Sequence, residues 1–172
     1  MPPHCDTLDG PVVNAAREAL SSGDVTLVLP WIPEQYEQEV REAFQKTLDV
    51  RELGDKARDL ADYWFFETCV RVHRIWEGAP YTGLKPAGLD EGPAVEAADR
   101  SMEEGSVDGV LDLLDKAVKD GVRQKFEETM TKRKEANQSL QAGRQWVSAY
   151  VEYIHYVKAI YDTARGEISH EE

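Results

Sequence analysis

The chain has 172 residues, of which 41% are hydrophobic and 31% are charged, values typical of an ordinary globular domain. Its formal net charge of −13 argues against nucleic acid or an anionic membrane surface as a partner, because phosphate binding requires clustered Lys and Arg. The sequence shows neither a membrane-spanning apolar stretch of roughly 20 residues nor a signal peptide. We therefore expect a cytoplasmic protein without nucleic-acid or membrane partners.

The sequence matches itself without a gap, because Gly10 aligns with Gly92, Trp64 with Trp146 and His73 with His155. These pairs share one shift, 82 residues, and a gap-free match of this length predicts an internal duplication. We expect a single domain over 1–172, with repeat 1 at about 9–80 and repeat 2 at about 91–164. An inter-repeat loop over about 78–91 and a frayed C-terminal tail over 165–172 complete this organisation.

Each repeat is expected to contain three helices. The first runs from Pro11 to about Ser22, since proline is favoured at the first helical position, and its counterpart spans 93–104. Prolines at 30 and 33 predict a break before the second helix that repeat 2 lacks. The third helices, about 55–76 and 138–163, are the most aromatic and are expected to lie centrally. The prediction is an all-α bundle of about six helices with pseudo-twofold symmetry.

Three consecutive potential metal ligands, His4, Cys5 and Asp6, precede the first helix. Imidazole, thiolate and carboxylate groups in a short segment can wrap around a metal ion. The alternative is a flexible N-terminal tail with incidental polar residues.

The third helices carry the other candidate ligands. His73 and Glu77 are four residues apart, and Glu152 and His155 are three apart, so each pair shares a helical face. An E-x-x-H pair places an oxygen and a nitrogen side by side, as in dimetal carboxylate bundles. If the repeats pack about a twofold axis, His73 and His155 converge on one site. The alternative is that both histidines are structural.

The Gly- and Pro-rich segment 77–88 follows the His73 helix and predicts a shaped loop. Tyr81 and Lys85 in this loop are candidates for a proton donor and an anion contact at the mouth of a site, with Glu77 and Tyr81 as the catalytic pair. The same segment is equally consistent with a plain linker between the repeats.

These candidates together predict a metal-binding helical protein whose His/Glu/Cys site holds iron, nickel, copper or zinc between the repeats. The leading hypothesis is a metal-dependent oxidoreductase or oxygen-handling enzyme that acts on a small molecule. A homo-oligomer is compatible with this hypothesis. The alternatives are a non-catalytic metal-binding, ligand-binding or sensory module, and a metal-independent enzyme in which His73 and Glu77 form an acid–base pair.

Several motifs extend along most of the chain: H-C-D at 4–6 with L-D-G-P-V-V at 8–13, F-F-E-T at 65–68, V-R-V-H-R at 70–74, and the segment 77–86. With them the chain resembles a family of small bacterial helical proteins of unknown function, whose members often carry a signal peptide. The H-C-D segment also resembles the mature N-terminus of nickel superoxide dismutase. That enzyme has a second cysteine four positions after its first, where this chain has Asp9, so a nickel dismutase is not expected.

Overall fold

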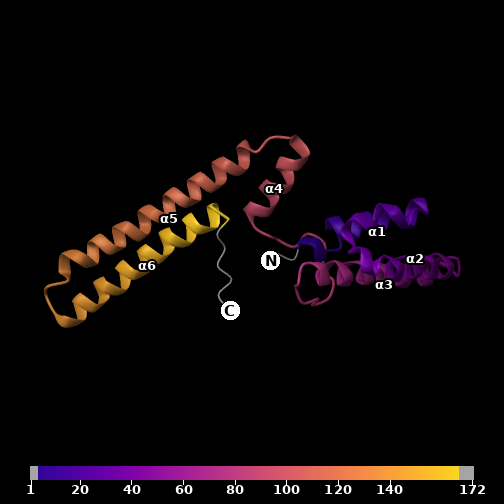
Figure 1. Ribbon diagram of the computed structural model, residues 1–172, viewed down its shortest axis with the longest axis horizontal. Helices are drawn as coiled ribbons and strands as arrows, with labels where there is room; N and C mark the ends of the chain where they lie inside the picture. The colour runs from indigo at the N-terminus through magenta and orange to yellow at the C-terminus, as the bar shows by residue number, and fades with distance from the viewer. Residues whose placement is uncertain (1–3, 167–172) are drawn as a thin grey trace. The chain divides into compact units, whose positions relative to one another are not determined.

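The computed structural model describes residues 4–166, which form six α-helices and four short 3₁₀ helices and contain no β-strand (Figure 1). The predicted all-α fold class is confirmed. None of the helices in the described part of the chain is both long and apolar enough to cross a membrane. Tertiary contacts divide the chain into two compact units, Met1–Val95 and Glu96–Glu172.

The first unit contains three α-helices and the four 3₁₀ helices. In chain order they are η1 (His4–Asp6), α1 (Pro11–Ser22), η2 (Val25–Leu27), η3 (Leu29–Trp31), η4 (Glu34–Tyr36), α2 (Glu37–Arg51) and α3 (Asp55–Trp76). Pro11 starts α1 and Gly23, with φ of 75°, ends it in the left-handed conformation that favours glycine. The predicted break at the two prolines is confirmed, since η3 and η4 occupy it before α2 begins.

Helix α3 is the centre of the first unit because both α1 and α2 pack against it. The rings of Phe44 on α2 and Phe65 on α3 lie 5.6 Å apart. The fully buried valine and phenylalanine side chains come from all three helices and from the segment between α1 and α2: Val12, Val13, Val28, Val40, Phe65, Val70 and Val72. This packing continues to the C-terminal end of α3, where His73 and Arg74 are also buried.

The second unit is built on an antiparallel hairpin of α5 (Asp108–Glu135) and α6 (Leu140–Ala164), seen side by side in Figure 1. The Thr129 hydroxyl donates a hydrogen bond of 3.1 Å across the hairpin to the carbonyl oxygen of Ala149. Gly121 permits the close approach of α5 to α6, because a Cβ atom there would lie 2.0 Å from the hydroxyl oxygen of Tyr156. Helix α4 (Pro93–Glu104) precedes this hairpin.

The bounds of α1 and α4 keep the offset expected from the sequence repeat, since α1 starts at Pro11 and ends at Ser22 while α4 starts at Pro93 and ends at Glu104. The bounds of α5 and α6 do not keep this offset from α2 and α3. The duplication and its twofold symmetry stay predictions. Burial differs between the units: α3 is buried along one side, whereas Ala149 is the one buried residue of α6. The reason is that no residue of α4, which is described in full, is buried, so α4 does not cover the hairpin. Of the tail expected to fray, residues 167–172 lie outside the described part of the chain.

Gly10→Ala should destabilise the first unit by about 1–3 kcal/mol, the usual cost of overpacking a tight site. The new Cβ atom would lie 2.2 Å from the His4 carbonyl oxygen and 2.9 Å from the Thr7 hydroxyl oxygen. The matched control is Gly109→Ala in α5, where nothing lies within 4 Å, and this change should stabilise the hairpin by about 0.4–1 kcal/mol. Urea denaturation followed by circular dichroism compares the two variants, and equal effects would contradict the steric explanation.

Candidate metal site

The N-terminal segment is fixed on the end of α3 by the loop that follows this helix. The Lys85 amide donates to the Asp6 carbonyl oxygen at 2.8 Å, and the Leu8 amide donates to the Lys85 carbonyl oxygen at 3.0 Å. These bonds form an isolated parallel bridge between Thr7 and Lys85. Residues 4–8 are therefore an ordered turn, with Cys5 and Asp6 buried, rather than a flexible tail.

Three of the predicted ligands come together in this unit: Cys5, His73 and Glu77 each offer a donor atom, and these atoms all lie within 4.8 Å of one another. Cys5 and His73 are buried, with exposed fractions of 5% and 2%, and the Glu77 side chain is 19% exposed. The Cys5 thiol comes from η1, whereas the other two groups lie one helical turn apart at the end of α3. This group could hold a metal ion.

The ring of His73 is oriented by a backbone carbonyl. Its Nδ1 atom lies 2.9 Å from the carbonyl oxygen of Trp31, which only accepts hydrogen bonds, so Nδ1 carries the proton. Nε2 is therefore the ring nitrogen that remains to act as a metal ligand, and it lies 3.6 Å from Glu77 Oε1. Nε2 is buried and has no hydrogen-bond partner among the described residues. This is the arrangement of metal-binding histidines, which usually donate their other ring N–H to a carbonyl or carboxylate.

A buried arginine holds both ends of the site. Arg74 donates from Nε and Nη2 to the two carboxylate oxygens of Asp6, at 2.6 and 2.8 Å, and from Nη1 to Glu77 Oε2 at 2.7 Å. The hydrogen bond that Arg74 donates to Asp6 raises the pKa of Arg74, so the guanidinium stays charged. Asp6, predicted as a metal ligand, lies against Arg74 and is not part of the Cys5–His73–Glu77 group. Its carboxylate instead fixes the turn that carries Cys5.

His4 and Tyr81 lie in the same unit but outside this group. The ring nitrogens of His4 are 3.7 and 3.9 Å from the Cys5 sulfur, so His4 flanks the thiol. The Tyr81 hydroxyl donates to Glu67 at 3.1 Å. Burial, together with this hydrogen bond, raises the pKa of Tyr81, so the phenol keeps its proton. Its expected role as a proton donor stays a prediction, as does the anion contact at Lys85, whose amino group donates to the Thr82 carbonyl.

The remaining predicted ligands, Glu152 and His155, belong to α6 in the second unit and are both exposed. Glu152 forms an ion pair of 3.6 Å with Lys125 and lies 3.3 Å from the Ser148 hydroxyl. Convergence of His155 with His73 stays a prediction.

Sequence reasoning missed Arg74 and Trp31. The spacing of Arg74 and Glu77 is a visible i, i+3 signal, but nothing local pairs Arg74 with Asp6, 68 residues away. The contact between His73 and the Trp31 carbonyl spans 42 residues and depends on the 3₁₀ turns at the two prolines. Cys69 is also buried, but it is not part of the group, and burial raises the pKa of its thiol. A buried thiol of this kind is chemically inert, so Cys69 is a poor candidate for a nucleophile.

A family model described as a family of unknown function (DUF6448) matches residues 9–156. The chain belongs to this family. The match includes His73, Glu77, Glu152 and His155, whereas Cys5 precedes its first residue. No curated protein and no solved structure matches the chain.

Arg74→Met should lower the free energy of unfolding by about 3–5 kcal/mol, because it leaves the buried Asp6 carboxylate without its counter-charge. The double variant Arg74→Met/Asp6→Leu should recover much of this loss, since well-packed apolar residues can replace a buried ion pair. Chemical denaturation of both variants and the parent measures the difference. A double variant as unstable as Arg74→Met would show that packing, not the buried charge, is responsible.

Asp9→Asn should lower the melting temperature near neutral pH. The Asp9 carboxylate accepts a hydrogen bond of 2.7 Å from the Gly88 amide, and this bond, with a smaller effect of Thr7, lowers the pKa of Asp9 below 3.8. A depressed pKa contributes stability that is present above 3.8 and is lost as the pH falls through the folded-state value. Thermal melts at several pH values should therefore show the parent converging on Asp9→Asn in acid. A difference that is the same at every pH would exclude this role.

Proposed function

We propose that the first unit binds one transition-metal ion through Cys5 Sγ, His73 Nε2 and the Glu77 carboxylate. The observation that carries this proposal is the buried Nε2 atom, which has no hydrogen-bond partner among the described residues and faces two further donor groups. Leaving such an atom unsatisfied costs about 1–3 kcal/mol. Coordination of an ion would remove this penalty.

The donor set supports a particular class of metal. A thiolate favours the later first-row transition metals over magnesium and calcium, which take oxygen ligands. Imidazole and carboxylate complete a mixed S/N/O set that suits zinc, iron, nickel or copper. Such ligands lie about 2.0–2.3 Å from zinc, so the three donor atoms need only a small contraction around an ion.

Arg74 and Trp31 support the same proposal as positioning residues. Trp31 fixes the tautomer of His73, and Arg74 holds Glu77 Oε2 so that Oε1 faces Nε2. Metal sites depend on such outer contacts, whose loss typically weakens binding about 10–100-fold. Asp6 anchors Arg74 and thereby links the ligand from η1 to the two from α3.

Three protein ligands leave one position for a fourth, and the occupant decides the function. If the position is open to a small molecule, the site suits the metal-dependent redox or oxygen-handling chemistry that we propose as its activity. His4 can close it instead, because its ring lies beside the Cys5 sulfur. The burial of Cys5 and His73 favours this second candidate, a non-catalytic metal-binding or sensory module.

Cobalt(II) titration tests the ligand set directly. The parent should bind one equivalent and develop a sulfur-to-cobalt absorption band in the near ultraviolet, which Cys5→Ser should abolish. Cys69→Ala is the matched control, because Cys69 is a buried thiol outside the group, and it should keep the band. His73→Ala and Glu77→Gln should each weaken binding at least tenfold.

Two further results separate the candidates. Glu152→Gln and His155→Ala should leave the affinity unchanged if the first unit alone holds the ion, whereas a loss would support the site shared between the repeats. His4→Ala should leave a catalytic site intact and should weaken a closed, non-catalytic one. A parent protein that binds no cobalt, zinc, nickel, copper or iron would contradict the proposed function.

A further inference from the structure

Two segments outside the α-helices hold the thiol ligand at the proposed metal site. They are residues 4–9, which precede α1, and residues 78–88, which follow α3. The Lys85 amide donates to the Asp6 carbonyl oxygen at 2.8 Å, and the Lys85 carbonyl oxygen accepts from the Leu8 amide at 3.0 Å. We call the two segments together the strap. Because these bonds join the segments to each other, we expect the strap to move as one element.

The strap is attached to the helices of the first unit chiefly by side chains. The Asp6 carboxylate pairs with Arg74 of α3, and the Tyr81 hydroxyl donates to Glu67 of α3 at 3.1 Å. From α1, the Arg17 guanidinium donates to a carbonyl oxygen of the strap at 2.9 Å. A segment held by a few such contacts opens locally at a lower free energy than the helices that it contacts.

The strap also covers apolar surface. Leu8, Tyr81 and Leu84 are partly buried and pack against the core of the first unit. Their burial favours the closed strap, and opening exposes these side chains to water. The surface that the first unit presents therefore depends on whether the strap is closed or open.

The ligands are out of reach of an incoming ion while the strap is closed. His73 is 2% exposed, Cys5 is 5% exposed, and the Glu77 side chain is 19% exposed. His73 and Glu77 belong to α3, at the centre of the unit, whereas Cys5 belongs to the strap. Because the strap carries the ligand that lies outside α3, its opening gives an ion access to the buried Nε2 atom.

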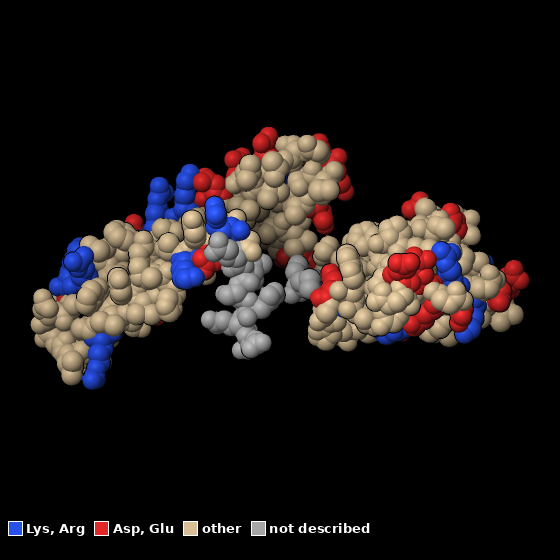
Figure 2. All heavy atoms as spheres, in the orientation of Figure 1, with Lys and Arg blue, Asp and Glu red and all other residues tan. Residues whose placement is uncertain are grey.

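The charge of the first unit favours the approach of a cation. Residues 1–95 carry 17 acidic and nine basic side chains, whereas residues 108–166, which include the α5–α6 hairpin, carry nine acidic and ten basic side chains. Figure 2 shows Asp and Glu side chains over the first unit and over α4, and Lys and Arg side chains over the hairpin. An excess of acidic groups raises the local concentration of cations. The unit that contains the candidate ligands is therefore the one that attracts a metal ion.

We propose that metal binding and closure of the strap are coupled, so that the strap opens to admit or release the ion and closes when Cys5 joins His73 and Glu77 around it. This inference rests on the proposed metal-binding function and adds its regulation. The three ligands are together only in the closed state, so the ion binds that state more tightly than the open one. By linkage, the bound ion stabilises closure by the same factor. The surface of the first unit then depends on metal occupancy.

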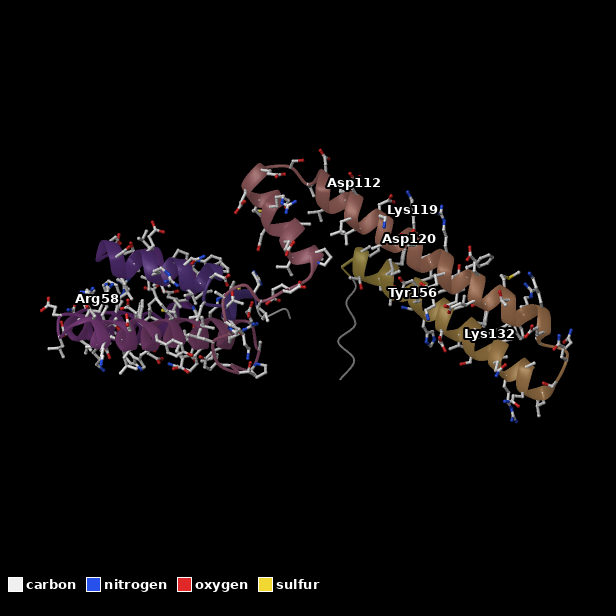
Figure 3. All side chains as sticks on the ribbon, turned by 180° about the vertical axis from the view of Figure 1, so that it is seen from behind. Arg58, Asp112, Lys119, Asp120, Lys132 and Tyr156 are labelled. Carbon is white, nitrogen blue, oxygen red and sulfur yellow. The ribbon has the colours of Figure 1, made fainter. Side chains whose placement is uncertain are left out.

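Hydrogen exchange of the full-length protein, with and without zinc, tests the coupling. In the metal-free protein the amides of Leu8 and Lys85 should exchange faster than the amide of Val72 in α3, because the strap opens without the helices. Zinc at about 100 times its dissociation constant should slow the two strap amides by about 10–100-fold, the upper value being the linkage limit. Amides of α5, on which Figure 3 labels Lys119 and Lys132, are the control and should be unchanged.

Cys5→Ala tests whether the thiol transmits the coupling. When this variant is saturated with zinc, the strap amides should exchange as fast as without zinc, because both remaining ligands lie on α3. Cys69→Ala is the matched control, since Cys69 is a buried thiol outside the group, and it should keep the protection.

Tyr81→Phe loosens the strap without removing a ligand. Loss of the hydrogen bond to Glu67 should speed exchange of the strap amides by about 2–10-fold. Zinc release to EDTA should become faster by a similar factor, because release also passes through the open strap. Tyr161→Phe, which changes an exposed tyrosine of α6, is the matched control and should alter neither rate.

Strap amides that exchange as slowly as Val72 in the metal-free protein would overturn the proposal, because the strap would then open only with the whole unit. Bound zinc that leaves strap exchange unchanged, or a release rate that rises in proportion to the EDTA concentration, would overturn the coupling and leave the metal site intact. A protein that binds no metal would overturn both the proposed function and the coupling.

Discussion

The buried ion pair between Arg74 and Asp6 joins the N-terminal turn to the end of α3, and the arrangement of the first unit's site depends on it. Both charges are withdrawn from water, so the pair adds little net stability, but either partner alone would be costly. The role of the ion pair is therefore to fix the relative position of the two segments that it joins. With one guanidinium donating to Asp6 and to Glu77, the turn that carries Cys5 and the helix that carries His73 and Glu77 hold one relative position.

That position gives the site its chemistry. His73 Nε2 has no hydrogen-bond partner among the described residues. The Trp31 carbonyl oxygen binds the other ring nitrogen, Nδ1, and the Glu77 carboxylate oxygen is 3.6 Å from Nε2. A buried nitrogen without a hydrogen-bond partner destabilises the fold, and such atoms are rare in native proteins unless they have a functional role. Family membership covers the helix that bears His73 and Glu77, while the thiol comes from the segment before the matched residues. The proposed metal site thus combines two candidate ligands within the family match and a third that precedes it.

The two units show how one pattern of apolar residues leads to different surfaces. In the first, α1 lies on α3 and the apolar stripes of α2 and α3 become core. In the second, α4 has the same length and register but fewer large apolar side chains, and the equivalent stripes stay exposed. A covering helix therefore decides whether such a stripe stabilises its own unit or remains available to a partner.

Local sequence determined the helices, because their signals act over a few residues: Pro11 and Gly23 bound α1, and the prolines at 30 and 33 interrupt the chain between α1 and α2. It also determined the His73–Glu77 pair, since helical spacing alone brings four-apart residues together. Only the tertiary structure decided that Cys5 joins them, that Asp6 binds Arg74 and that Tyr81 binds Glu67. Those contacts join residues distant in the chain or across a loop. Their geometry follows from how α1, the 3₁₀ turns and the 78–88 loop pack on α3, which no local pattern specifies.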